Sequence, residues 1–308
     1  MAAVSRSMSL MDWGQVVLLS ILWGGSFFFI GVAIDDFHYL AIVFSRVALA
    51  AAALLVAVRL AGLAMPFRLD WWRPLMVMSI LNNVVPWTMI TWGQTEIASG
   101  LAAIFNATTP LFTVVIANFF TTDEKLTPGK IFGVVLGLCG VAVMIGPDLL
   151  EGLGTALLAQ LAVIAACVSY ACSGVFARRL HDRPPLTLAA GQMVCSTVFM
   201  LPPLLLFAPP WSQPIPAWTS IAAITCLGLF STAFAYLLVF RIIRSAGATN
   251  FSLVTFLLPI TAIILGAAFL HERLDPGAFI GMALIGLGLS AIDGRPAAAL
   301  ARMAGKRG

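Results

Sequence analysis

The sequence predicts an all-α integral membrane protein with ten transmembrane helices, arranged as two inverted five-helix repeats, with both termini in the cytoplasm. Three observations lead to this fold class: the composition, the spacing of apolar segments and an internal repeat. Of the 308 residues, 61% are hydrophobic and only 10% are charged, whereas a soluble domain has about 25% charged residues. This composition argues against a soluble enzyme, a disordered protein or a nucleic-acid-binding protein, and it predicts a polytopic membrane protein.

Ten apolar segments are long enough to cross a bilayer, which requires about 20 mostly apolar residues. Proline, glycine and aspartate separate the segments, as at residues 127–129 and 275–277. Most of the connections are short, so no extramembrane domain is expected. The predicted spans are residues 13–34, 38–61, 71–93, 97–120, 128–146, 152–177, 186–208, 217–240, 247–270 and 276–292.

Basic residues set the predicted orientation, because Lys and Arg are enriched in cytoplasmic loops. When the N-terminus is placed inside, all of the 17 Lys and Arg residues except Arg46 and Arg273 lie in cytoplasmic segments. Arg273 falls in an external loop, and Arg46 falls within the second span. This alternation also explains the formal net charge of +4 without a nucleic-acid partner.

The two halves of the chain repeat one pattern. The stretch E-K-L-T-P-G-K-I-F-G from Glu124 returns as E-R-L-D-P-G-A-F-I-G from Glu272. Each half contains five spans, an odd number, so the second copy must enter the membrane from the opposite side. We therefore divide the chain into a first five-helix repeat (residues 1–148), an inverted second repeat (149–294) and a basic cytoplasmic tail (295–308). Inverted repeats are typical of alternating-access transporters.

Several short motifs follow one another along the chain. They are Trp23-Gly24 in the first span, S-R-V-A-L-A from Ser45 in the second, the spans that contain Pro110 and Pro259, and the two E-x-L-x-P-G-x-x-x-G stretches. In this order they resemble the drug/metabolite transporter superfamily, in its EamA-type branch of ten-span proteins. The resemblance covers nearly the whole chain. It implies a secondary transporter of the bacterial inner membrane, usually an exporter of amino acids or related metabolites. Within the branch the chain looks most like the YddG type, which exports aromatic and other neutral amino acids.

The sequence contains no catalytic motif of the HExxH, G-x-S-x-G or P-loop kind. The five cysteines lie within apolar segments and show no CxxC spacing, so we expect neither a metal site nor a cofactor. No Asp or Glu falls in the middle of a predicted span, which argues against a proton-driven drug pump. We therefore predict that the chain is not an enzyme. A multidrug exporter of apolar cations and, in another class, a membrane-embedded enzyme or a metabolite sensor are the alternatives.

Arg46 lies about eight residues into the second span, roughly 12 Å below the outer face. One interpretation is that it binds a substrate carboxylate, because a guanidinium pairs well with such groups. The other is a structural arginine that bonds to backbone carbonyls or extends its side chain toward the interface. The resemblance implies that arginine occurs here in transporters of differently charged substrates, which favours the structural role.

Polar and aromatic residues form stripes on several predicted spans. On the third span, Ser79, Asn83 and Trp87 recur at helical spacing. The repeat pairs Asn83 with Thr232 and Trp87 with Tyr236. Polar side chains are disfavoured in lipid, so these faces should point inward, either toward a substrate cavity or as hydrogen-bonding contacts between helices. The candidate substrate-binding residues are Trp23, Ser26, Arg46, Ser79, Asn83, Trp87, Asn106, Tyr170, Ser173, Thr232, Tyr236 and Thr255.

Pro110 and Pro259 occupy equivalent positions in the two halves, and we predict that they kink the fourth and ninth spans as hinges. A glycine series at residues 129, 133 and 137 allows close helix packing. We predict that this packing is within one chain and that the protein is a monomer, with a homodimer as the alternative. The expected partners are a small-molecule substrate, an amino acid or related metabolite, and the lipid bilayer.

Overall fold

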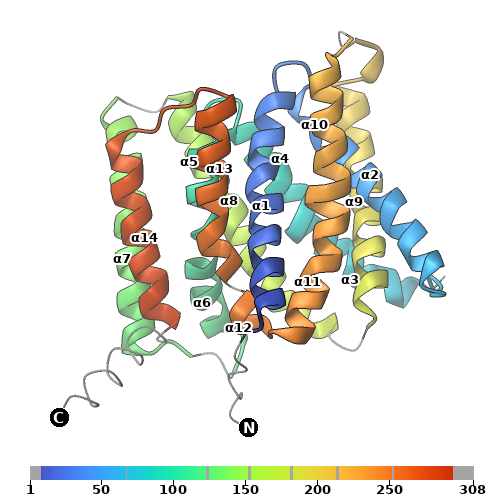
Figure 1. The fold of residues 1–308 in the computed structure, drawn as a ribbon, viewed down its shortest axis with the longest axis horizontal. Coiled ribbons are helices and arrows are strands. Elements are labelled where there is room, and N and C mark those ends of the chain that lie inside the picture. Colours follow the sequence, from blue (N-terminus) through green and yellow to red (C-terminus); the bar gives the residue numbers. More distant parts are fainter. Residues whose placement is uncertain are drawn as a thin grey trace.

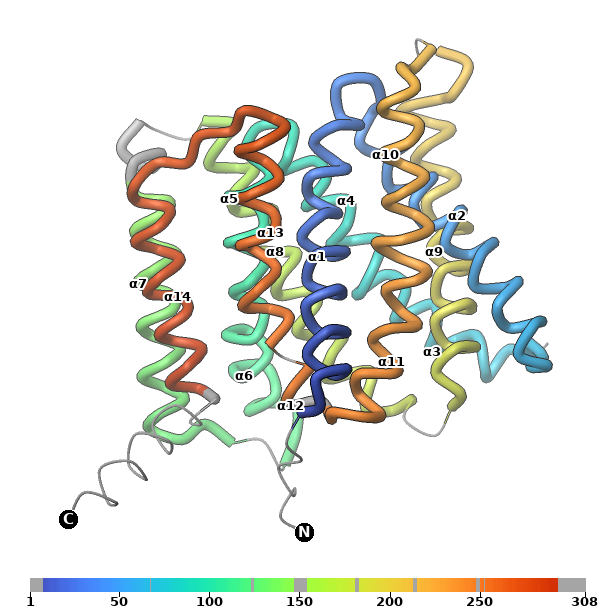
Figure 2. The backbone as a smooth tube through the Cα atoms, viewed as in Figure 1, coloured from blue at the N-terminus to red at the C-terminus, as the bar shows by residue number. Residues whose placement is uncertain are grey.

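The computed structural model describes residues 8–66, 68–122, 125–151, 154–180, 183–212, 215–251 and 253–293. Glu124, which begins the first E-x-L-x-P-G stretch, and the predicted basic tail at 295–308 lie outside the described residues. The described part is a bundle of helices whose order along the chain can be followed by colour in Figures 1 and 2.

The helices closely follow the predicted spans. They are α1 (Leu10–Ala33), α2 (Tyr39–Leu60), α3 (Leu69–Ser79), η1 (Ile80–Val84), α4 (Val85–Gly93), α5 (Ser99–Asn106), α6 (Thr109–Phe120), α7 (Pro128–Glu151), α8 (Thr155–Ala177), η2 (Arg178–Leu180), α9 (Pro185–Phe207), η3 (Pro210–Ser212), α10 (Trp218–Gly228), η4 (Leu229–Phe234), α11 (Ala235–Ser245), α12 (Ala248–Phe251), α13 (Leu253–Phe269) and α14 (Pro276–Asp293). Among these described elements no strand occurs, and the all-helical prediction is confirmed.

Eight helical stretches of the described chain are long and apolar enough to cross a membrane. Two shorter apolar helices, Leu253–Phe269 and Pro276–Ile292, follow them and correspond to the ninth and tenth predicted spans. Large apolar side chains such as Phe132 and Ile264 are exposed on the outside of the bundle, as a lipid-facing surface requires. The structure is therefore that of an integral, multi-pass membrane protein.

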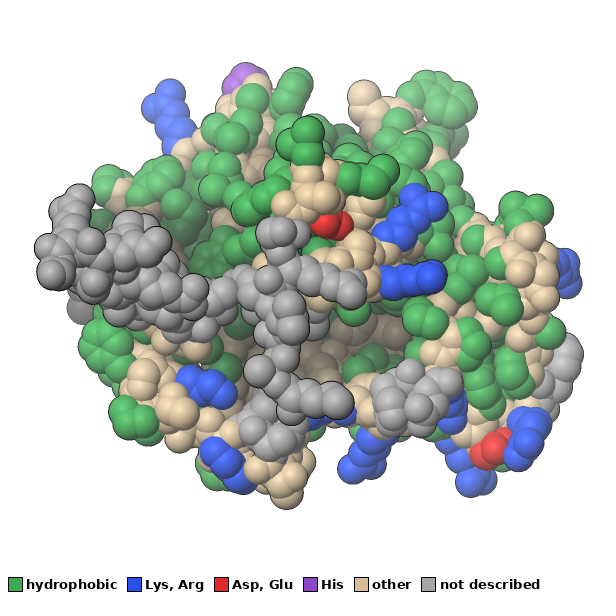
Figure 3. Space-filling model, turned by 60° about the horizontal axis from the view of Figure 1, so that its bottom comes forward, with side chains coloured by type: hydrophobic (Ala, Val, Ile, Leu, Met, Phe, Trp, Pro, Cys, Tyr) green, Lys and Arg blue, Asp and Glu red, His purple; other side chains and the backbone are tan. Residues whose placement is uncertain are grey.

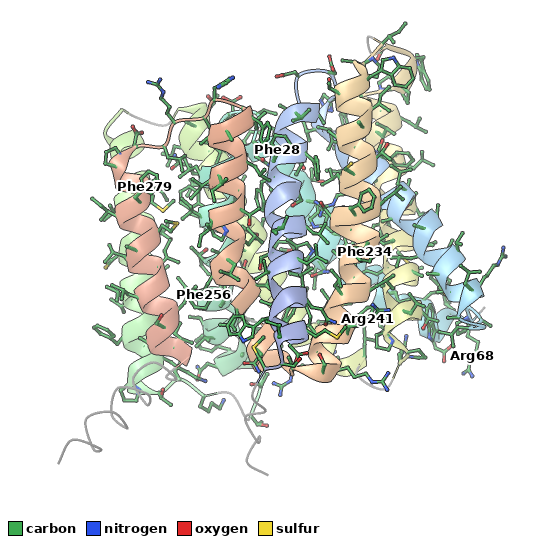
Figure 4. The ribbon with its side chains drawn as sticks, in the orientation of Figure 1. Phe28, Arg68, Phe234, Arg241, Phe256 and Phe279 are labelled. Carbon is green, nitrogen blue, oxygen red and sulfur yellow. The ribbon has the colours of Figure 1, made fainter. Side chains whose placement is uncertain are left out.

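Two ends of the bundle serve as references below. We call the end where α6, α8 and α11 end the lower face, and the end that carries the loop between α13 and α14 the upper face, as they are drawn in Figure 1. Figure 3 turns the lower face toward the viewer and shows Lys and Arg side chains at several places around it. Figure 4 places Arg68 and Arg241 at this same end, whereas Arg273 lies in the loop of the upper face.

Two short π-helices interrupt the third and eighth spans at equivalent points. The segment η1 joins α3 to α4, and η4 joins α10 to α11. Inside η4, the Thr232 hydroxyl donates to the carbonyl oxygen of Leu227, five residues earlier, at 2.8 Å. A π-helix inserts one extra residue into a helical turn, so it rotates the following side chains and is frequent at functional sites.

The helices α7 and α14 form an antiparallel pair at one side of the bundle (Figures 1 and 2). Glycines allow their backbones to touch. A Cβ atom on Gly288 would lie 2.5 Å from the carbonyl oxygen of Gly133, and one on Gly140 would lie 2.7 Å from that of Gly281. No larger residue fits at these crossings without separating the helices, so the predicted glycine packing occurs within this chain.

Candidate functional site

A cavity of about 540 Å³ lies in the middle of the bundle, between the first and second halves of the chain. Its walls come from α1, α2, η1, α4, α5, α6, α8, η4, α11, α12 and α13. Of the predicted binding residues, those that line it are Trp23, Ser26, Arg46, Trp87, Asn106, Tyr170, Ser173, Thr232, Tyr236 and Thr255. The structure therefore brings residues from both halves of the sequence to one space.

The cavity extends toward the lower face. Its lining reaches Gly174, near the lower end of α8, and Phe251 on α12, which lies at the lower end of the bundle (Figure 1). Toward the upper face its lining reaches Ile30 on α1 and Ile90 on α4, which are only 1% and 5% exposed. The cavity is therefore closed above by apolar packing.

Arg46 projects from α2 and is held in place by two side chains. Its Nε donates to the Thr232 hydroxyl at 2.9 Å, and its guanidinium carbon lies 3.7 Å from the centre of the Trp87 ring. The Thr232 hydroxyl, in η4, is itself fixed by its bond to the carbonyl of Leu227 in α10. The π-helix thus orients the threonine, and the threonine orients the arginine.

The charge of Arg46 has no carboxylate partner in the described part of the chain. The side chain is only 8% exposed, and no described Asp or Glu lines the cavity. The structure gives no hydrogen bond from its Nη1 or Nη2 atoms to a described residue. A buried cation is costly without a partner, and an anionic group that enters the cavity would accept two charge-assisted hydrogen bonds from these atoms.

Asn82 is a cavity residue that the sequence analysis did not include. Its Nδ2 donates to the Tyr236 hydroxyl at 3.2 Å, and its Oδ1 accepts a bond from the Ser173 hydroxyl at 2.9 Å. This network connects η1, α8 and α11 across the cavity wall. Helical spacing from Trp87 favours Asn83, but the extra residue of η1 turns Asn82 toward the cavity instead. The π-helix is a feature of the folded chain, and helical spacing in the sequence does not reveal it.

Two predicted residues lie elsewhere. Asn83 is fully buried against α9, where its Nδ2 donates to the Ser196 hydroxyl at 2.8 Å and its Oδ1 accepts from Gln192 at 3.1 Å. The Ser79 hydroxyl donates to the carbonyl of Met76 in its own helix. Neither lines the cavity. Asn83 therefore connects helices, which is the other role considered for these polar stripes.

The fourth span is broken at the level of the cavity. Helix α5 ends at Asn106 and α6 begins at Thr109, with Pro110 as its second residue and as a cavity residue. In the second half, by contrast, α13 continues through Pro259, which is buried and does not line the cavity. The carbonyl end of one half-helix and the amide end of another meet at the break, an arrangement that transporters use to bind polar groups.

Two further polar groups at the cavity lack a partner. The Asn106 Oδ1 and the Ser231 Oγ are buried and accept or donate no hydrogen bond within the described structure. Both residues line the cavity, Asn106 at the helix break and Ser231 within η4. Buried polar groups in folded proteins are nearly always hydrogen-bonded, so these two atoms are exceptions in the wall of the cavity.

Aromatic rings form much of the remaining wall. Trp23 packs edge-to-face on Phe251, with ring centres 5.9 Å apart. Tyr170 and Tyr236 contribute further rings to the same wall. A mostly apolar wall with a few polar groups suits a small amphipathic ligand.

Both halves of the chain that form this cavity match the same protein family. The profile of the EamA-like transporter family matches residues 14–146 and again residues 157–292. The chain belongs to the EamA-like transporter family. Its EamA-like fold is also found in a solved crystal structure that is 18% identical, with a TM-score of 0.64 over 92% of this chain and 96% of the other.

Relatives of this EamA-like transporter cover almost its full length. An uncharacterized transporter of Bacillus subtilis (strain 168), YoaV, is 24% identical over 277 residues, which are 89% of this chain and 94% of the relative. An inner membrane transporter of Escherichia coli (strain K12), YedA, is 24% identical over 280 residues, or 89% and 87% of the two chains. A probable terminal-alkyne amino-acid exporter of Streptantibioticus cattleyicolor is 24% identical over 283 residues, or 91% and 92%. The protein is therefore a membrane transporter with a small-molecule substrate, and proteins of this kind are generally not enzymes.

Proposed function

We propose that the protein exports neutral amino acids, aromatic ones among them, by alternating access through the central cavity. The observation that carries this proposal is Arg46, a buried cation at the cavity wall without a described carboxylate partner. A substrate carboxylate would supply that partner and accept two parallel hydrogen bonds from the Nη atoms. The name of the Streptantibioticus relative as an amino-acid exporter supports the same substrate class.

The other parts of the substrate have suitable partners as well. Asn106, at the carbonyl end of α5, would accept a hydrogen bond from the substrate ammonium group, because this helix end carries partial negative charge. Ser231 offers a further hydroxyl. The rings of Trp23, Tyr170 and Tyr236 would surround an apolar side chain.

The distribution of basic residues supports a cytoplasmic lower face, with the protein in the bacterial inner membrane and both termini inside. Lys and Arg gather around the lower face, and cytoplasmic loops are enriched in both. The cavity extends toward that same face. In this conformation an exporter would receive its substrate from the cytoplasm.

Several paired features support the division into two inverted repeats. The π-helices η1 and η4 hold equivalent positions, with Asn82 matching Ser231. In the α7–α14 pair, Gly133 contacts Gly288. Their equivalents in the other repeat, Gly281 and Gly140, also contact each other. Such reciprocal contacts are what a two-fold axis in the membrane plane would produce.

Export of apolar cations is supported less well. A cationic drug would bring a second positive charge next to Arg46, and no described carboxylate lines the cavity to offset it. Counterflow in proteoliposomes tests the two substrate classes directly. We expect accumulation of phenylalanine and other neutral amino acids, and none of a quaternary ammonium cation or a sugar phosphate. Accumulation of the quaternary cation without any amino acid would overturn the proposal.

A further inference from the structure

Gln94 carries a buried amide that makes no hydrogen bond within the described part of the chain. The residue is only 7% exposed, and neither its Oε1 nor its Nε2 has a partner there. A glutamine amide has two donors and an acceptor oxygen, and buried groups of this kind are nearly always bonded. The amide is therefore in an unfavourable environment in this conformation.

Gln192 shows the usual behaviour of a buried glutamine in this protein. It is 6% exposed, almost the same as Gln94, but its Nε2 donates to the Asn83 Oδ1 at 3.1 Å and connects α9 to η1. Gln94 makes no such connection to a described residue. Hydrogen bonding between helices therefore does not account for a polar side chain at position 94.

Gln94 lies above the cavity residues of α4. Its backbone N donates to the carbonyl oxygen of Ile90 at 3.0 Å, so the helical geometry of α4 continues to this residue. Trp87 and Ile90 line the cavity, and at 3.6 residues per turn both lie on the same face of the helix as Gln94. The connection that follows ends at the upper face, where the Ser99 backbone N donates to Glu272 at 2.8 Å. Gln94 is thus one turn closer to the upper face than the cavity.

Apolar residues close the cavity in this region. Ile90 and Ile97, which precede and follow Gln94 in the chain, belong to one buried cluster with Phe27 of α1. Ile30, a cavity residue of α1, is 1% exposed. An unpaired amide is costly in such an environment, because no surrounding water replaces the missing hydrogen bonds. Gln94 therefore opposes the closed state of the upper face.

Opening of the upper face would bring Gln94 into contact with water. In alternating access the cavity opens toward each side of the membrane in turn. When the apolar residues around Ile90 separate, the cavity continues along the same face of α4 and reaches Gln94. The amide then gains hydrogen bonds that it lacks in the closed state, and a gain confined to one conformation shifts the equilibrium toward that conformation.

We propose that Gln94 lines the pathway from the cavity to the upper face, which we call the upper pathway, and that its amide forms hydrogen bonds with the substrate there. This inference rests on the proposed transport of amino acids by alternating access. The amide can donate to a carboxylate and accept from an ammonium group, so it suits both charged groups of an amino acid. It has no charge of its own, so it holds a carboxylate less tightly than the Arg46 guanidinium, as release requires.

Cysteine labelling tests the upper pathway without a known substrate. Q94C is made in a cysteine-free background, and a membrane-impermeant maleimide is added to right-side-out or to inside-out vesicles. T95C, at an exposed position next to Gln94, identifies the vesicles whose upper face is accessible. We expect Q94C to react in those vesicles only. The matched control is Q192C, which is equally buried but does not line the cavity, and it should react in neither. Failure of Q94C to react faster than Q192C would overturn the proposal.

The variant Q94M removes the amide but retains an unbranched side chain. Because the closed state no longer contains an unpaired polar group, we expect Q94M to be at least as thermally stable as the parent protein. Labelling of a cysteine at Ser26, a cavity residue on α1, through the upper face should become about tenfold slower, as for the loss of one hydrogen bond made only in the open state. The apparent affinity for phenylalanine on the upper side should fall by a similar factor, and that on the lower side should not change.

The control Q192M distinguishes this role from a structural one. It removes the bond to Asn83, so it should lower the thermal stability without slowing the labelling of Ser26 through the upper face. A comparable loss of stability in Q94M, or labelling of Ser26 at the parent rate, would contradict the proposal. The result is separate from substrate identity: if Q94C and Q94M behave as expected but no amino acid is transported, the upper pathway stands and the substrate assignment falls.

Discussion

Replacement of Arg46 by lysine separates a carboxylate-binding role from a purely structural one. Arginine has five N–H groups, of which the Nε group is bonded to Thr232 while those on Nη1 and Nη2 have no partner in the described protein. Lysine retains the positive charge but cannot hold Thr232 and a carboxylate at once in this geometry. R46K also loses the stacking of the guanidinium on Trp87, at 3.7 Å.

The expected magnitude follows from the bonds that are lost. A hydrogen bond between charged groups contributes about 1.5–3 kcal/mol, so R46K should weaken phenylalanine binding by roughly 10–150-fold. Phenylalaninamide has the same ring and ammonium group but a neutral amide in place of the carboxylate, so its affinity should fall much less. The assay is competition against a transported radiolabelled amino acid in proteoliposomes, with expression and thermal stability measured in parallel.

Arg183 supplies a matched control, because its guanidinium also lies over a tryptophan, Trp71, at 5.7 Å, but outside the cavity. R183K should leave both affinities unchanged. An equal loss of affinity for phenylalanine and phenylalaninamide in R46K would assign Arg46 a structural role only. Undiminished phenylalanine transport in a stable R46K protein would refute the carboxylate anchor.

Three further predictions concern Thr232, the two prolines and the membrane topology. T232V removes the acceptor of the arginine Nε, which should cost about 1–3 kcal/mol of amino-acid affinity; calorimetric titration checks this, and an unchanged affinity would show that Trp87 alone positions the arginine. P110A and P259A should each slow turnover more than they change affinity, because alanine restores a helix bond that proline removes; wild-type rates in counterflow would make both prolines merely structural. Single cysteines at Thr122 and Asp275 should label from opposite sides of the membrane in intact cells, and equal labelling from outside would contradict the inverted repeats.

The positions of the spans could be predicted from the sequence because bilayer thickness fixes the length of an apolar segment. The predicted first span at 13–34 corresponds to α1 at Leu10–Ala33, and the second at 38–61 to α2 at Tyr39–Leu60. Most of the predicted binding residues line the cavity, since a polar residue such as Asn106 is disfavoured in lipid and tends to face the interior. Hydropathy and spacing are sufficient for these features.

Features that depend on a local change of helix geometry or on tertiary contact were not predictable. Helical spacing pointed to Asn83, but the π-helix η1 turns Asn82 to the cavity and places Asn83 against α9. The break between Asn106 and Thr109 adjoins Pro110, where a kink was predicted, but the continuation of α13 through the equivalent Pro259 was not. The bonds from Glu272 to Ser99 join residues far apart in the chain, and one sequence without its fold does not contain that proximity.

The helices around Pro110 and Pro259 differ in continuity, and this difference affects the free energy of a conformational change. One pattern is present in two forms: α6 restarts at Thr109, just before Pro110, whereas α13 begins earlier, at Leu253, and is continuous through Pro259. Since proline has no N–H to donate, the unbroken form already lacks one of its backbone hydrogen bonds. Straightening the broken span therefore regains one bond fewer than it would in a proline-free helix, a difference of about 1 kcal/mol. The two prolines thus bring the broken and unbroken forms closer in free energy, and under the proposed alternating access a small difference between these forms would favour rapid turnover.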